Sequence, residues 1–497
     1  MTLSLPLTRP SCMRLRHGLG CRKWSIDLGG DMGGHRFRRS NVWAVRAAVL
    51  SIFAILLVSA RSALGVPAFA RKYGTSCMTC HTIYPKLNPF GEAFRRNGYR
   101  FPGVDSDYVK QDTVALGQDA YKKEFPHAVW PGTLPGSVPL ALGFNGQAVV
   151  HPNRNSGGGQ ADNGARLNLN DLIEEGHIWA GGSFDDQITF FGELTFASGT
   201  SEIEHVGVYF NDLVGPPHAL NLAVGKITST LSTFGPHSSY LVDLATPPLS
   251  VTALYGATSD SWNVGDAYNG VEVNGTINGR LDYAAGVNSG ANVNVRSPGD
   301  FYGHIGYKFG GVRLDGEKGS SVPDAMRPWA EKALTLQAFY YRSASHFTAS
   351  DATILDDTAS TFGGGARAQW NSLEFDTGIY QERHDRAQVG GGVVKALVQY
   401  NELSYVVYPW LVPAVRVEYI KLSPSGGPAV TDLRAFAGVE ALVRPNIKLS
   451  LIAQVEKASG APPGGWGAAS GLAAPITPTA SVGPEVEAIS LGLAFAF

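Results

Sequence analysis

The chain has 497 residues, with 60 glycines, 4 cysteines and a formal net charge of −2 at pH 7. A chain of this length has room for two or three ordinary domains. Hydrophobic residues make up 44% of the chain and charged residues 16%, which excludes a bundle of membrane-spanning helices. The sequence also lacks any nucleic-acid-binding signature.

One long apolar run, Ala47–Ala60, follows a group of arginines and precedes small residues. This order is typical of a secretory signal peptide, and the run is shorter than the ~20 residues of a spanning helix. We therefore predict a leader over residues 1–65, with Met32 as an alternative start. Its removal would leave Cys77 and Cys80 as the cysteines of the exported chain.

The sequence Cys77-Met78-Thr79-Cys80-His81 has the spacing of a c-type haem attachment site. In such a site two thiols bind the haem covalently, and the adjacent imidazole ligates the iron. A zinc site would need further Cys or His pairs, and a thioredoxin-type pair would need a βαβ setting. We therefore predict one covalent haem c, held by Cys77 and Cys80, with His81 as an axial ligand.

Residues 66–136 form a compact unit that we interpret as a monohaem cytochrome c segment. Asn88 followed by Pro89 predicts the start of a short helix, and Asn97-Gly98 predicts its end. Phe90 and Phe94 would share one face of this helix. Because about 70 residues make a marginal core by themselves, we expect both rings to pack against the haem.

The sixth ligand of the haem iron is left open by the sequence. Met78 lies inside the attachment motif and cannot fold back onto the iron. His127, a histidine from the later chain, or an open position remain. Five basic residues of the segment could meet haem propionates, anchor it to the acidic remainder of the chain, or face solvent: Arg71, Lys72, Arg95, Arg96 and Arg100.

Residues 137–497 show alternation with a period of two, for example over 433–443 and 447–455. One face of each segment is apolar and the other carries charges of both signs. A soluble sandwich or a membrane barrel could produce this pattern. Long strands, export and a final strand that ends at Phe497 favour a barrel in the bacterial outer membrane, with its apolar face on lipid.

Sixteen candidate strands follow from this alternation, an even number as such barrels require. Short links follow even-numbered strands and long links mostly follow odd ones, except the long link 312–331. This asymmetry places both termini, and with them the haem motif, on the periplasmic side. The strands are predicted at 137–151, 166–183, 186–198, 202–212, 218–227, 266–277, 280–289, 300–311, 332–346, 360–371, 372–385, 393–409, 411–423, 430–445, 446–459 and 484–497.

The haem motif, the run Pro85-x-Leu87-x-Pro-Phe-Gly91, Phe94 and Gly98-Tyr99 directly precede this long barrel. Together they resemble the fused cytochrome–porins of bacterial outer membranes, whose best-known members are iron-oxidising cytochromes. The resemblance implies a mainly β fold, in which a small α-helical monohaem segment plugs a sixteen-stranded antiparallel porin. Glu92 stands where we expect a basic residue in the iron-oxidising group.

The resemblance also implies electron transfer from external Fe(II) to periplasmic carriers, such as a cytochrome, with possible Fe(II):cytochrome c oxidoreductase activity. Two alternatives remain, a diffusion porin with a haem-containing plug and electron export to an external acceptor. A dedicated iron site would need clustered oxygen and nitrogen ligands, and the sequence shows no such cluster. We expect contacts with outer-membrane lipid and none with nucleic acid.

Overall fold

The computed structural model describes residues 68–103, 105–115, 123, 133–135, 139–151, 166–169, 172–173, 175–197, 200–231, 237, 240–241, 251–255, 257–259, 267–290, 299–316, 327–349, 354–387, 392–463, 466 and 482–496. All of them belong to one compact unit that spans residues 60–497. The predicted leader and His127 lie outside the described residues. Within the described ranges, no helix is both long and apolar enough to cross a membrane.

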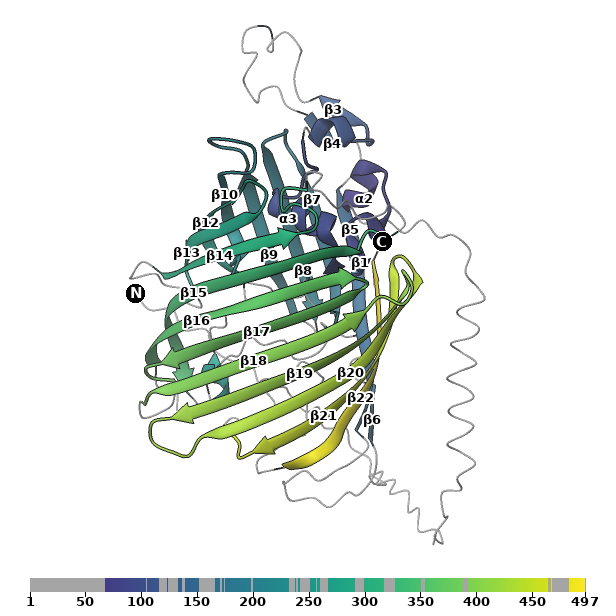
Figure 1. The fold of residues 1–497 in the computed structure, drawn as a ribbon. Coiled ribbons are helices and arrows are strands. Elements are labelled where there is room, and N and C mark those ends of the chain that lie inside the picture. Colours follow the sequence, from purple (N-terminus) through teal and green to yellow (C-terminus); the bar gives the residue numbers. More distant parts are fainter. Residues whose placement is uncertain are drawn as a thin grey trace, which may run out of the picture. The chain divides into compact units, whose positions relative to one another are not determined.

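An antiparallel barrel of sixteen strands forms most of the molecule (Figure 1). It closes where the last strand pairs with the first, from Ile489 opposite Val150 to Ala496 opposite Gly143. The strands are β5 (Leu140–His151), β7 (Glu175–Ser183), β8 (Ile188–Ala197), β9 (Thr200–Phe210), β10 (Asn221–Thr228), β12 (Ala267–Ile277), β13 (Leu281–Asn288), β14 (Asp300–Gly310), β15 (Glu331–Ala349), β16 (Ile354–Asn371), β17 (Leu373–His384), β18 (Val394–Tyr405), β19 (Leu411–Pro424), β20 (Val430–Arg444), β21 (Ile447–Ser459) and β22 (Val482–Ala496).

The two faces of the barrel have opposite character. On β17, Phe375 and Ile379 are 40% and 50% exposed on the outer face, whereas Asp376 and Glu382 are 3% and 0% exposed on the inner face. A soluble sheet buries its apolar face, so this burial is inverted. A closed barrel with an apolar exterior satisfies every strand hydrogen bond in lipid. The predicted transmembrane barrel is confirmed.

One predicted strand, 166–183, is divided in the structure. It consists of β6 (Arg166–Asn168) and β7, and both segments pair with β5. Leu172 and Ile173 lie exposed between them, in a turn where the amide of Leu172 donates to the Leu169 carbonyl. The short strand β11 (Ala257–Ser259) similarly pairs with β15 outside the main ring.

The N-terminal segment is helical around the cysteine motif. Its elements are α2 (Ala68–Tyr73), η1 (Cys77–Thr79), β1 (His81–Ile83), β2 (Lys86–Leu87), α3 (Pro89–Arg96) and η2 (Asp105–Tyr108), followed by the pair β3 (Thr113–Ala115) and β4 (Thr133–Pro135). The predicted helix is confirmed as α3. The Asn88 side chain caps it by accepting the amide of Gly91 at 2.9 Å, and Asn97 follows its last residue.

We call residues 68–108 the plug, because ion pairs fix them to the inner wall of the barrel. Lys86 binds Glu374 and lies 3.8 Å from Asp376. Arg96 lies 3.6 Å from Asp282, and Arg100 binds Asp212. Asp212 lies two residues after the end of β9, and Glu374 is the second residue of β17. Both positions are at the end of the barrel that carries the short turns, so the plug lies at that end.

The first residues of the long link after β14 lie against the plug at the same end. The Asn97 side chain donates to the Asp315 carbonyl at 3.0 Å. A Cβ on Gly316 would lie 2.5 Å from Pro102 and 3.1 Å from Ala93, so this part of the link touches the plug closely. The strand after the link is β15, so the link does not change the strand count.

The described residues of two other links lie inside the barrel. After β10, the amide of Tyr240 donates to Glu402 at 2.8 Å, and the short helix α5 (Val251–Leu254) is buried. After β21, Trp466 is 1% exposed and packs in one cluster with α5 and Tyr380 of the wall. These segments fill part of the interior between the wall and the plug.

Candidate functional site

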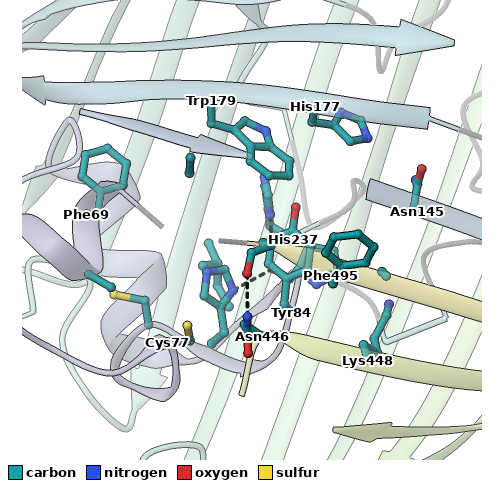
Figure 2. A pocket seen from close by; sticks show the side chains of 18 of the residues that line it. Phe69, Cys77, Tyr84, Asn145, His177, Trp179, His237, Asn446, Lys448 and Phe495 are labelled. Carbon is teal, nitrogen blue, oxygen red and sulfur yellow. Dashed lines mark hydrogen bonds between the residues drawn. The ribbon is translucent and has the colours of Figure 1, made fainter. Parts of the chain in front are cut away.

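The cysteine motif faces a cavity of about 710 Å³ inside the barrel (Figure 2). Cys77, Cys80 and His81 line it together, and the plug and barrel wall both contribute to its surface. Both thiols are free of disulfides. This volume lies within the ~300–1,000 Å³ of ordinary ligand and cofactor pockets.

The turn of the motif is held against α3 by Asn88. The Asn88 amide group donates to the carbonyls of Met78 and Thr79 at 2.9 and 3.0 Å, and its backbone N–H donates to the Cys80 carbonyl at 2.9 Å. A Cβ on Gly91 would lie 1.9 Å from that same Cys80 oxygen. The Pro-Phe-Gly sequence therefore allows α3 to approach the motif at backbone contact.

Burial sets the protonation of these groups. It raises the pKa of the Cys80 thiol to about 12, and the neighbouring Cys77 adds to this effect. Burial lowers the pKa of His81 to about 4. The imidazole is therefore neutral at physiological pH, which is the form that ligates metals.

A second, partly buried histidine, His237, lies in the same cavity. Its Nδ1 and the Nδ1 of His81 are each 3.2 Å from the carbonyl oxygen of Pro85. Burial also lowers the pKa of His237, to about 3. A carbonyl can only accept, so both Nδ1 atoms carry the proton and both Nε2 atoms keep a lone pair.

Aromatic side chains form much of the plug beside the cavity. Phe94 lines the cavity and lies 5.1 Å from Phe69, ring centroid to ring centroid. Tyr99 stacks on Phe69 at 5.7 Å. Phe90 packs on Phe101 at 5.1 Å and does not contribute to the described cavity lining. The structure thus brings only one of the two predicted phenylalanines to the cavity.

The five basic residues singled out in the sequence have different environments. Lys72 donates to Ser183 of β7 at 2.8 Å, Arg71 donates to the Leu140 carbonyl, and Arg96 and Arg100 bind carboxylates of the barrel. Arg95 lines the cavity. Four of the five therefore anchor the plug, and Arg95 is the one placed to meet a cavity ligand.

A further group of side chains, missed at the sequence level, lines the cavity from β7, β8 and β9. It comprises His177, Glu193 and Glu204, whose ligand atoms lie within 4.8 Å of one another, with Glu175 beside them. Trp179 stacks on His177 with ring centroids 5.1 Å apart and planes 6° from parallel. The alternation of the sequence could have predicted that His177 and Glu193 face the lumen. It could not have predicted that they lie at the same level along the barrel axis.

No protein-family model matches this chain, and no curated protein does. Among solved structures it is similar to OmpT of Vibrio cholerae, with 12% identity, a TM-score of 0.44, and coverage of 77% of this chain and 100% of that chain. It is also similar to an anion-selective porin from Comamonas acidovorans, with 11% identity, a TM-score of 0.47, and coverage of 73% and 99%.

The strand pairing and burial of this chain themselves establish its class. Sixteen antiparallel strands close on one another, with apolar side chains outside and buried charges inside. Barrels of this kind belong to the bacterial outer membrane. The protein is a porin-like β-barrel of that membrane.

Proposed function

We propose that the protein is an outer-membrane electron-transfer protein, with one haem c held in the cavity by Cys77 and Cys80. His81 would be an axial ligand. The observation that carries this proposal is that both thiols, the imidazole and Phe94 face one cavity inside a lipid-embedded barrel. The attachment sequence by itself gives no reason for such a cavity to surround it.

The residues present fit a haem. The cavity has cofactor size, one aromatic side, two free thiols and two neutral imidazoles. His237 would help to hold the haem pocket, because it shares the Pro85 carbonyl with His81 and so fixes the turn beside the motif. Arg95 is placed to bind a propionate, since charge-assisted bonds from guanidinium to carboxylate are strong. When bound, the haem supplies a one-electron redox couple.

The protein's own part is to fix and shield this group. The capped turn at Asn88 holds the motif, and the aromatic side of the cavity limits access of water. Because the environment and axial ligands tune a haem potential, the buried imidazoles would set the potential of the site. The donor would be Fe(II), and the acceptor a periplasmic cytochrome or similar carrier.

A series of ring contacts extends from the motif along the wall. His81 lies 5.5 Å from Tyr84, Tyr84 lies 6.1 Å from Trp179, and Trp179 stacks on His177 at 5.1 Å (Figure 2). Ser183, at the end of β7, contacts the plug through Lys72. His177 is about 20 Å farther along the strand at ~3.3 Å per residue. The contacts therefore run from the plugged end toward the opposite mouth.

The two alternative functions make different demands on the lumen. A diffusion porin needs an open channel, whereas here α5, Trp466 and the plug occupy the interior. Export of electrons to an external acceptor would use the same residues in the reverse direction. A distinctly low redox potential would favour export over uptake from Fe(II).

The proposal is tested with purified protein mixed anaerobically with Fe(II) in a stopped-flow spectrometer. We expect the absorption bands of reduced haem to appear, and covalent haem to vanish in the double variant Cys77→Ala/Cys80→Ala. Persistence of haem staining in denaturing gels of that variant would overturn the covalent assignment. No reduction by Fe(II) at any physiological pH would overturn the proposed donor.

A further inference from the structure

We propose that His177, Glu193 and Glu204 form a binding site for a divalent transition-metal cation on the inner wall of the barrel. The three side chains come from the neighbouring strands β7, β8 and β9, and each offers one ligand atom within 4.8 Å of the others. Glu175 lies beside them, its Oε2 3.5 Å from His177 Nε2. Figure 2 shows His177 directed into the cavity.

The site depends on an irregularity in the pairing of β8 and β9. Glu193 is opposite His205, but the next residue, Leu194, is opposite Ile203, so Glu204 is the extra residue of a β-bulge. In regular alternation Glu204 would point away from the side on which His205 lies. Bulges re-aim single side chains and are common beside functional sites. Here the bulge puts Glu204 and His205 on the same inner side of β9, and Glu204 supplies a second carboxylate to the cavity.

Neighbouring groups hold two of the proposed ligands in place. Trp179 Nε1 donates to Glu193 Oε1 at 2.7 Å, and the Thr195 hydroxyl donates to Glu204. His177 Nδ1 lies 3.1 Å from the same Glu193 oxygen. Hydrogen bonds from outside the ligand set orient metal-binding side chains in this way. Without a cation, the same atoms can form an ion pair between a protonated His177 and the carboxylates.

The ligand chemistry points to Fe(II) or Mn(II) rather than to a soft metal. One imidazole and two or three carboxylates give an oxygen-rich site without thiolates, and such donors suit these cations. The nearby Lys226 is occupied by Glu202 at 2.7 Å and does not neutralise the cluster. The carboxylates therefore remain available for a cation.

The position of the metal site suits the proposed function, because the bound cation would be the electron donor. This role of the site rests on the proposed function. His177 is the end of the ring series that leads through Trp179 and Tyr84 to His81. A cation at His177 would thus be held in the cavity but away from the covalent attachment point. Metal binding itself needs no haem, so it can be measured independently.

The experiment titrates Mn(II) into purified wild-type protein and follows the free Mn(II) signal by electron paramagnetic resonance. We expect one site per chain. Glu193→Gln and Glu204→Gln should each weaken binding at least about tenfold. Asp385→Asn is the control, since it removes a half-exposed carboxylate that follows β17 and does not line the cavity, and it should leave binding unchanged.

Circular dichroism of each variant verifies that the β-barrel is still folded. Absence of a wild-type site, or equal loss in Asp385→Asn and Glu204→Gln, would overturn the proposed metal site. Haem content and reduction are measured on the same preparations. Normal Mn(II) binding without haem would contradict the proposed function alone, whereas reducible haem without Mn(II) binding would contradict the metal site alone.

Discussion

His81 and His237 share one hydrogen-bond acceptor, the Pro85 carbonyl oxygen, which lies 3.2 Å from the Nδ1 of each ring. They are 156 positions apart in the sequence. The amide of Leu87 also donates to the His237 carbonyl at 3.0 Å. His237, in the link after β10, is therefore bound to the plug by two hydrogen bonds.

The first prediction concerns His237 as a residue that positions His81. Both imidazoles donate to the Pro85 carbonyl, so His237→Ala leaves that carbonyl to His81 alone and should strengthen its hydrogen bond. Because hydrogen bonds to a ligating imidazole tune the metal that it binds, we expect a lower redox potential with the haem still attached. His218→Ala is the control, since His218 is buried but does not line the cavity. An unchanged potential in His237→Ala would contradict this positioning role.

A second prediction tests the close contact between α3 and the motif. Gly91→Ala places a Cβ 1.9 Å from the Cys80 oxygen, a backbone atom that cannot rotate away. Such overpacking typically costs about 1–3 kcal/mol, and we expect lower thermal stability with a reduced yield of covalent haem. In Gly426→Ala the new Cβ meets nothing within 4 Å. Equal behaviour of the two variants would show that α3 and the motif can separate freely.

The third prediction is a pH dependence of plug attachment through Glu92. Burial would raise its pKa, but the guanidinium groups of Arg367 and Arg96 outweigh burial and hold the pKa of Glu92 well below its ordinary 4.5. A carboxyl with a depressed folded-state pKa stabilises the fold above the unfolded value. That stabilisation is lost as pH falls below about 4.5 toward the folded-state pKa.

Glu92→Gln should therefore destabilise the plug by about 3 kcal/mol at neutral pH, since it breaks a buried ion pair. The difference from wild type should shrink as the pH falls below 4.5. Thermal unfolding followed by near-ultraviolet circular dichroism reports on the plug aromatics. A difference that is constant from pH 7 to pH 3 would contradict the role of the Glu92 charge.

The sequence was sufficient for the barrel because alternation is a local signal. The sixteen predicted strands correspond in order to sixteen observed ones, and the capped helix at Asn88 was equally local. The position of Glu204 was not predictable in this way. Glu204 and His205 share the inner face only because of a bulge opposite Glu193, and strict alternation would send one of the two to the lipid face.

Contacts across the lumen also could not be predicted from a sequence pattern. Nothing in the residues around His237 indicates that this link returns to Pro85, because the contact is fixed by closure of the barrel. Glu92 illustrates the same limit, since its departure from the expected basic residue is matched by Arg367 on β16. Ion pairs of this kind can be identified only when the position of the plug against the barrel wall is known.

The last prediction concerns conductance. Barrels of sixteen to eighteen strands commonly leave an aqueous channel, but here Trp466 and Leu241 are buried inside the lumen, and Arg416 Nη1 approaches the Leu241 carbonyl at 3.5 Å. Protein reconstituted in planar bilayers should therefore conduct far less than an open porin. Because protein segments fill the lumen, loss of haem in Cys77→Ala/Cys80→Ala should change this little.

Removal of one filling side chain should have a larger effect. Trp466→Ala deletes a ring that is 1% exposed and packs against the inner wall, so transient openings should become more frequent. Trp410→Ala is the matched control, because Trp410 is 40% exposed in the turn between β18 and β19. A steady, porin-like current through wild-type protein would contradict a filled lumen and favour the diffusion function instead.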